Sequence, residues 1–389
     1  SLVRQDKEII NNYSLQINQK QKSNLAVLTS HGTTEAVKIA DFMSSIDPYY
    51  QLASFDLKAL EDEPEKTLEN LKRFKLLFVS NPTEPFNEIE KYLLDQHLIH
   101  GGRQWWAINS VAFNRDSLFN SSESAVAIGR SLNMENSFFK YGFRLKKNLI
   151  KDLYCAPIVL ARGTNNNAQY LPYPMPYYPL VKPRSNELFG SRSGNVFVPF
   201  PSTIDTLKNQ LDKTILIGSS DFSHTIQTPT SISLEEFTKK INPTFFDQKS
   251  QPLGILIEGE FKSVFENRVP PLKLDFNRAK GISKMIVFSS GSIAENQVDK
   301  GKPLELGYDK WTNNFYSNKL FLQKTVHYLM DNQKLLKLQN KTVDIPRLDA
   351  QKIKQISGYL KILLLLAPLL IISLIGGIVY IYRIRSFSR

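Results

Sequence analysis

Apolar and polar residues form blocks along the first third of the chain, and the blocks have the lengths of strands and helices. Four short apolar runs have the pattern of buried strands: 25–30, 50–57, 75–82 and 103–111. Three longer segments between them have helical spacing: 34–46, 63–74 and 85–102. Strands that alternate with helices predict βαβ units and a mainly parallel sheet.

Two helices in this part have specific sequence signals. Thr33 or Thr34 is expected to cap the helix at 34–46, because threonine hydroxyls accept from free amides at helix starts. The helix at 85–102 reads as amphipathic and ends at a glycine pair. Its inward residues are expected to be Phe86, Ile89, Leu93, Leu94 and Leu98.

The remaining pattern divides the soluble part of the chain into further segments. Residues 1–23 are expected to form a helical lead-in and residues 24–115 a first α/β domain of flavodoxin-like or amidotransferase-like type. An irregular connection rich in proline and aromatic residues is expected at 116–195. A second α/β part is expected at 196–340, with strands at 196–207, 213–221, 253–261 and 284–293 and a closing helix at 318–332.

The prolines of the connection restrict its structure. The segment 171–183 reads LPYPMPYYPLVKP, and proline lacks the amide that a helix or a central strand needs. An extended segment packed on the body or on a partner is therefore predicted.

An uncharged run of 21 residues lies near the C-terminus, at 362–382. At about 1.5 Å per residue, a helix of this length crosses a hydrocarbon core about 30 Å thick. Residues 341–361 are then a juxtamembrane arm and 383–389 a basic tail. The sequence predicts one C-terminal transmembrane helix.

The net charge of +12 is concentrated near this helix. Residues 334–389 contain ten basic and two acidic residues, whereas the other 333 residues contain 39 and 35. Clustered basic residues beside a span interact with anionic lipid head groups. Since the sequence also lacks zinc-finger spacing and nucleic-acid-binding motifs, we expect membrane lipids as partners and no nucleic acid.

Few residues suggest catalysis or metal binding. The single cysteine, Cys155, excludes an intrachain disulfide and reads as structural, since no nucleophile elbow surrounds it. Ser289 and Ser290 in SSGS read as a strand-end turn. His97 and His100 have a spacing that can bind metal, but no third ligand is evident, and a solvated helix end is favoured. We expect no catalytic, cofactor-binding or metal-binding residues, and no cofactor.

Five sequence segments come in a characteristic order: NLAVLTSHG (24–32), EIEKYLLDQHLIHGGRQWWAINSV (88–111), FFKYGFRLKKNLIKDLYCAPIVLA (138–161), ILIEGEFKSVFENR (255–268) and PLELGYDKWTNNFYSNKLFLQKTVHYLMD (303–331), followed by the terminal helix. In these segments and their order the chain resembles the GldG family, the gliding-motility-associated ABC transporter auxiliary proteins of Bacteroidota. The resemblance extends from about residue 24 to residue 382. The turn at 29–32 departs from the acidic, glycine-flanked turn of relatives.

The resemblance implies an accessory subunit, and since the family has no established catalytic residues, none is carried over to this sequence. Its implied partners are an ABC permease subunit, a cytoplasmic ATPase reached through it, and envelope or secretion-system components, with roles in gliding motility and type IX secretion. It also implies that this chain lacks an N-terminal membrane helix and a further domain found in relatives. Lys352, Lys354 and Lys361 balance Arg383, Arg385 and Arg389, so charge does not orient the helix. The resemblance places the helix in the inner membrane and the body in the periplasm.

Two other classes of function stay open at this stage. One is a membrane-tethered hydrolase or amidotransferase-like enzyme, which the missing nucleophile elbow disfavours. The other is a periplasmic ligand-binding module, because open α/β sheets bind ligands at the carboxyl ends of their strands.

Three small residues of the terminal helix, Ser373, Gly376 and Gly377, share one helix face. Helices associate in lipid through close packing at small residues. The patch is either a docking face for a permease helix or a stretch that only faces lipid. If it docks, Gly376→Leu with Gly377→Leu should reduce detergent pull-down of the transporter severalfold while membrane insertion persists. Wild-type recovery of the transporter would rule out docking through this patch.

Overall fold

A computed structural model describes residues 22–60, 62–119, 124–162, 169–184, 189, 194–272, 277–332, 335–336, 366–368 and 372–383. The chain divides into two compact units, Ser1–Lys341 and Thr342–Arg389. The predicted lead-in up to residue 21 and the predicted arm from 341 to 361 lie outside the described residues.

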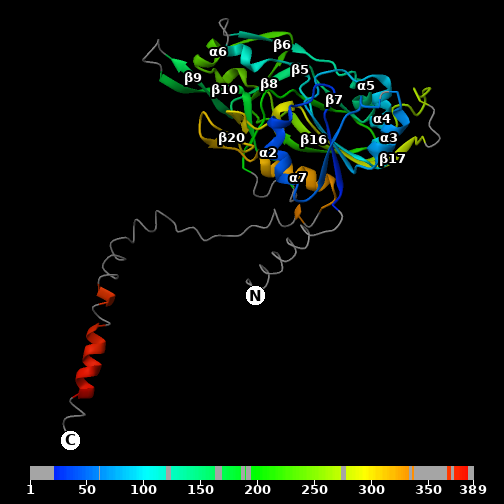
Figure 1. The fold of residues 1–389 in the computed structure, drawn as a ribbon. Helices are drawn as coiled ribbons and strands as arrows, with labels where there is room; N and C mark the ends of the chain where they lie inside the picture. The colour runs from blue at the N-terminus through cyan, green and yellow to red at the C-terminus, as the bar shows by residue number, and fades with distance from the viewer. Residues whose placement is uncertain are drawn as a thin grey trace. The chain divides into compact units, whose positions relative to one another are not determined.

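One mixed, mostly parallel sheet of seven strands organises the first unit (Figure 1). The strand order is β13-β16-β17-β4-β3-β1-β2. The strands are β1 (Asn24–Leu28), β2 (Gln51–Phe55), β3 (Leu76–Ser80), β4 (Arg103–Ala107), β13 (Asp212–Gly218), β16 (Pro252–Lys262) and β17 (Lys280–Phe288). Strands β2, β1, β3, β4 and β17 are parallel, and β16 runs antiparallel to both of its neighbours. The α/β class is thus confirmed, and strands from both predicted α/β parts join one sheet.

Alternate residues of the sheet pack into two different cores. Leu77 and Trp106 belong to the core beneath the helices α3 (Pro64–Lys72) and α4 (Glu88–Ile99). Phe78 and Trp105 belong to the core beneath α2 (Ala36–Ile46) and α7 (Asn318–Leu329). Because side chains alternate along a strand, the central strands β3 and β4 are buried on both faces, which explains why each contains consecutive apolar residues, 76–79 and 105–107.

Helix α4 is not amphipathic, in contrast to the prediction. Every residue from Glu90 to Ile99 is buried. The helix begins with a capping box, in which Asn87 accepts from the amide of Glu90 and the Glu90 carboxylate accepts from the amide of Asn87. Residues distant in sequence, including Tyr141 and Phe261, belong to the same core and cover its polar face. A one-dimensional pattern does not reveal such a cover.

The predicted threonine cap of α2 is wrong. The N-cap residue is Glu35, without a side-chain capping bond. Thr33 Oγ1 donates to the carbonyl oxygen of Leu28, and Thr34 Oγ1 lies 3.1 Å from Glu295 Oε1. Both hydroxyls therefore hold the loop after β1 in place instead of capping the helix.

The segment 116–195, predicted to be irregular, contains ordered antiparallel structure around a third core. The small strands are β5 (Val111–Ala112), β6 (Ser124–Gly129), β7 (Phe143–Leu145), β8 (Asn148–Asp152), β9 (Cys155–Arg162), β10 (Gln169–Val181), β11 (Val196–Phe197), β12 (Ile204–Thr206), β14 (Ser223–Gln227) and β15 (Thr230–Ser233). They pair as β11-β10-β9, β12-β7, β14-β8 and β15-β6-β5.

The short helices are α5 (Glu135–Lys140) and α6 (Leu234–Thr238), with 3₁₀ turns η1 (Arg115–Phe119), η3 (Pro243–Phe245) and η4 (Gly291–Ala294). Two hairpins follow, β18 (Val298–Asp299) with β19 (Lys302–Pro303) and β20 (Tyr308–Asp309) with β21 (Asn314–Phe315).

The proline-rich segment is extended as predicted, but it does lie between two strands. β10 pairs with β9 along most of its length and with β11 only at Leu180 and Val181. Pro172 and Pro174 are two residues apart in the regular part of β10, so their nitrogens point to one edge of the strand. That edge has no paired strand at these positions within the described residues, so no ladder hydrogen bond is lost.

In the second unit, one helix is long and apolar enough to cross a membrane, judged by length and composition. It extends over Leu366–Arg383, within which residues 366–368 and 372–383 are described. This agrees with the span predicted at 362–382.

Two buried histidines predict how stability depends on pH. Burial lowers the pKa of His97 and of His327 to about 4, so both stay neutral in the folded protein. An unfolded histidine titrates near ~6.5, so stability is complete above that pH and falls as the pH drops toward ~4. Each histidine should lower the free energy of unfolding at pH 5 by on the order of 1–2 kcal/mol relative to pH 7. The decrease is measurable as a lower urea midpoint at pH 5 than at pH 7.

The substitution His97→Gln should reduce this pH dependence, since glutamine has no ionised form. His224→Gln is the matched control, because the His224 side chain is 37% exposed. If the free energy of unfolding depends on pH equally in wild type and in His97→Gln, the lowered pKa of His97 is contradicted.

Candidate functional site

The candidate site is the carboxyl edge of the main sheet between β1 and β3. The helices that follow these two strands, α2 and α4, pack into different cores on opposite faces of the sheet. Open α/β sheets bind ligands in the crevice at such a switch point. Here the two loops bond to each other: the amides of Thr83 and Glu84 donate to the carbonyl oxygen of His31, and the amide of Thr34 donates to that of Ser80. The crevice is therefore closed by the chain itself.

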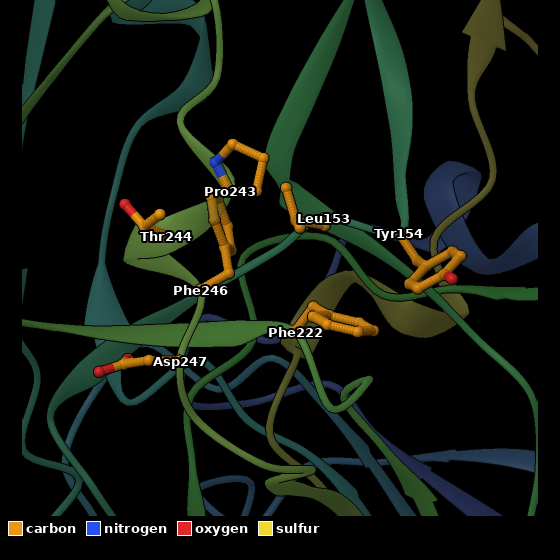
Figure 2. A pocket seen from close by; sticks show the side chains of 7 residues that line it. All are labelled: Leu153, Tyr154, Phe222, Pro243, Thr244, Phe246 and Asp247. Atoms are coloured by element: carbon orange, nitrogen blue, oxygen red, sulfur yellow. The ribbon is translucent and has the colours of Figure 1, made fainter.

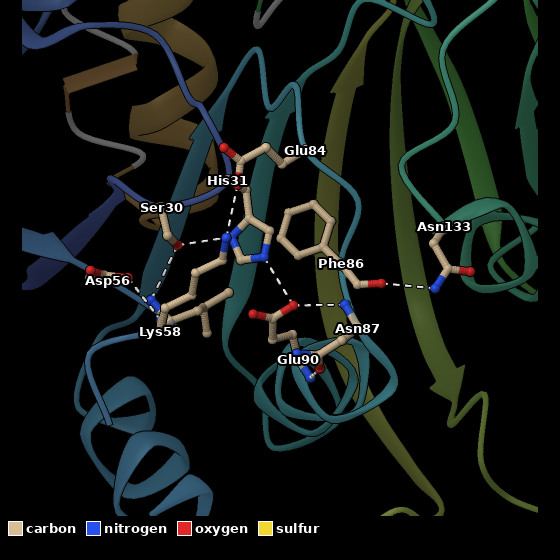
Figure 3. A network of polar contacts seen from close by, with 10 residues as sticks. Ser30, His31, Asp56, Lys58, Glu84, Phe86, Asn87, Glu90 and Asn133 are labelled. Carbon is tan, nitrogen blue, oxygen red and sulfur yellow. Dashed lines mark hydrogen bonds and ion pairs between the residues drawn. The ribbon is translucent and has the colours of Figure 1, made fainter. Parts of the chain in front are cut away.

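His31 lies at the centre of this closure (Figure 3). Its ring stacks on Phe86 with centroids 4.0 Å apart and planes at 14°. Nδ1 lies 2.9 Å from Ser30 Oγ, and Nε2 lies 3.0 Å from Glu90 Oε2. The Ser30 hydroxyl accepts from the amide of Leu57, so one row of contacts connects the loops after β1 and β2 to helix α4.

The backbone at this turn adopts an unusual conformation. His31 has φ of 62° and Gly32 has φ of 59°, two successive residues in the left-handed region. A side chain at Gly32 would overlap with Thr83, so the turn needs glycine there. The strain at His31 persists because its ring is fixed by stacking and by two polar contacts.

Burial and hydrogen bonding have opposite effects on Glu90. Burial raises its pKa, but the contacts with the His31 ring and the Asn87 amide lower it more, so the net pKa lies below the ordinary value. Glu90 is therefore ionised at neutral pH inside the protein, where removal of its partner is costly.

The row Ser30–His31–Glu90 contains the three residue types of a hydrolase triad. Ser30 is 8% exposed and His31 2% exposed, and Phe86 covers one face of the ring. A substrate carbonyl must reach the serine oxygen within hydrogen-bond distance, and this burial prevents that approach. The arrangement functions as an internal brace in this conformation.

The other residues considered for catalysis or metal binding are dispersed. Burial and the nearby Asp152 raise the pKa of Cys155 to about 12, so its thiol is a poor nucleophile. Ser289 Oγ and Ser290 Oγ donate to the carbonyl oxygens of Leu253 and Pro199, as expected of a strand-end turn.

His97 and His100 were predicted to lie at a solvated helix end. This prediction is wrong for His97, which is a buried residue of α4. Its Nε2 lies 3.0 Å from the carbonyl oxygen of Phe74, and Nδ1 of His100 bonds the carbonyl oxygen of Gln96. Among the described residues no group of three or more His, Cys, Asp or Glu side chains is arranged to hold a metal ion.

Asp95 forms a second buried polar centre, which no sequence motif singles out. Its carboxylate accepts from Ser263 Oγ at 2.6 Å, the Val264 amide at 2.9 Å and Tyr141 Oη at 2.8 Å. Burial nevertheless raises its pKa. The only signal in the sequence is an acid that lies between the apolar residues Leu94 and Leu98 of a helical segment, LLDQHL.

An open hollow lies in the antiparallel part, with a cavity volume of about 500 Å³ (Figure 2). Its lining residues are Leu153, Tyr154, Phe222, Pro243, Thr244, Phe246 and Asp247. The lining is mostly apolar, and few polar groups converge on it, whereas a specific site for a small polar ligand needs several.

In the second unit, the predicted docking patch is exposed. A Cβ atom added at Gly376 or Gly377 would meet no atom within 4 Å, so within the described residues this face is uncovered. Ser373 lies on the same helix and is exposed as well.

The fold and the site together define an open α/β protein whose ligand crevice is closed by its own side chains. A family profile described as an ABC-type uncharacterized transport system matches residues 22–325. The chain belongs to this family and is an auxiliary component of an ABC-type transport system, with which it associates.

The comparison with solved structures found a protein described as "mmIFT52 N-terminal domain", with 11% sequence identity and a TM-score of 0.44. The match covers 79% of this chain and 97% of that chain. The comparison with curated proteins found no match.

The contact between His31 and Glu90 can be measured by a double-mutant cycle. His31→Asn retains a residue that tolerates the left-handed region but leaves the buried carboxylate without its ring partner. We expect a loss of about 2–4 kcal/mol in the free energy of unfolding at pH 7, and less than additive loss when Glu90→Gln is combined with it. Additive losses within ~0.5 kcal/mol would show that the two residues do not interact.

Proposed function

We propose that this chain is a non-catalytic, membrane-anchored accessory subunit of an ABC transporter that serves gliding motility and type IX secretion. The observation that carries the proposal is the closed switch-point crevice, in which Ser30, His31 and Glu90 bond to one another. A body without an open polar crevice is suited to hold or position partner proteins. The motif order shared with the GldG family supports the motility and secretion role.

The anchor and its orientation are part of this proposal. The apolar helix at Leu366–Arg383 would hold the chain in the inner membrane, with the body in the periplasm. The permease subunit would be the direct partner, and the cytoplasmic ATPase would be reached through it.

Affinity purification of the full chain from native membranes, followed by mass spectrometry, tests the proposal. We expect the permease and the ATPase to be recovered together with it, and recovery to be unchanged by Ser30→Ala. A chain purified alone in several mild detergents would contradict the accessory role. Loss of transport in a folded Ser30→Ala protein that still binds the permease would favour the hydrolase alternative.

Topology is tested separately with reporters fused after Arg389. A reporter that is active only in the cytoplasm is expected to be active when it is fused after Arg389. Activity of a periplasm-specific reporter at the same position would contradict the orientation, since the tail and the body lie on opposite sides of a single span.

A further inference from the structure

Strand β2 forms one edge of the main sheet, and part of its backbone faces away from β1. The amide of Gln51 donates to the carbonyl oxygen of Ser23, and the carbonyl oxygen of Phe55 accepts from the amide of Thr29. In a parallel ladder, alternate residues bond to the same neighbour, so 51, 53 and 55 face β1. The amides and carbonyls of Leu52 and Ser54 therefore point outward. Within the described residues none of these four groups has a hydrogen-bond partner.

The opposite edge of the sheet is protected, whereas β2 is not. At β13 the carbonyl oxygen of Leu216 accepts from the amide of Arg184, and the register shifts twice. That strand also begins with two charged residues, Asp212 and Lys213. Strand β2 reads QLASF, without a charge, a proline or a register shift. Natural sheets use such devices to keep edges from pairing, so their absence marks an edge suited to pair.

We propose that β2 pairs antiparallel with β2 of a second copy of this chain, about a two-fold axis through Ala53. The outward residues Leu52 and Ser54 are equally spaced from Ala53. Leu52 of one copy therefore faces Ser54 of the second copy, and Ser54 faces its Leu52. Four backbone hydrogen bonds form and the two sheets become continuous. At the axis Ala53 meets its own counterpart in a non-hydrogen-bonded pair, where the Cα atoms are about 4.5 Å apart and a small side chain fits.

The surroundings of β2 favour a second copy over a foreign strand. The segment 56–73, which follows β2 and contains the next helix, has six acids and four bases, a net charge of only −2. Two copies of this weakly charged segment repel each other little, whereas a strongly charged edge would select an oppositely charged partner.

Cysteine cross-linking tests the register directly. In full-length protein carrying Cys155→Ser, Ala53→Cys should form a disulfide-linked dimer on mild copper-catalysed oxidation by air, because paired Cα atoms at about 4.5 Å are within disulfide range. Ser54→Cys is the matched control. It is exposed and adjacent, but two residues of offset place its Cα more than about 7 Å from its counterpart, so it should not cross-link.

Solution mass provides a second, independent measurement. Light scattering of the detergent-solubilised chain should give twice the mass of one chain, and Ser54→Pro should raise the dissociation constant at least tenfold. This proline removes only an outward amide and therefore spares the pairing with β1. Ser54→Ala keeps the amide and should behave as wild type, and circular dichroism checks that each variant is folded.

A monomer at all concentrations without cross-linking at position 53 would overturn the proposal. So would a disulfide from Ala53→Cys that forms in membranes only with a different protein, because the edge would then bind a foreign strand. If Ser54→Pro fails to fold, the contrast between the two cysteine positions still decides.

Discussion

A helix surrounded by protein on every side must satisfy each of its polar side chains internally, and α4 imposes this constraint on the rest of the body. Glu90 contacts His31 after β1, and Asp95 contacts Tyr141 and the loop at Ser263. Gln96 donates to the carbonyl oxygen of Arg278, and His97 Nε2 lies against the carbonyl oxygen of Phe74. Each contact fixes a different segment against one rigid element. The closed crevice is therefore one consequence of burying this helix.

The elements that the sequence predicted well are those with strong local signals. The central strands have a strong local signal because both of their faces are buried, which places apolar residues side by side in the sequence, as at 76–79 in β3 and 105–107 in β4. The antiparallel strands of the third core were largely missed because they are short and pair with distant partners. β14 pairs with β8, and β15 pairs with β6, over separations that no local pattern encodes. The prolines of β10 suggested that this segment cannot be a central strand. That inference was too broad, because a proline removes a ladder hydrogen bond only where its edge of the strand has a partner.

The site was harder to predict than the fold. His31 was read as a turn residue, and nothing near it in the sequence indicates Phe86 or Glu90 as contacts. The same limit applies to His97, whose position beside a glycine pair suggested solvent, while its ring is covered from the end of α3. In both cases the decisive partner is brought by tertiary packing, which also changes the energetic role of the residue from a surface group to a buried brace. The candidate membrane span behaves differently, since its length and composition alone carry the signal.

The alternating prolines of β10 have a consequence beyond local pairing. A strand from Gln169 to Val181 is long enough to serve as a template for cross-β growth, which requires donors and acceptors at regular intervals on a free rim. Because the rim at 172 and 174 presents pyrrolidine rings in place of amides, an incoming chain finds no donor there. The body thus keeps a long, aromatic-rich strand without the amyloid hazard that such a strand would otherwise bring while the protein is folding.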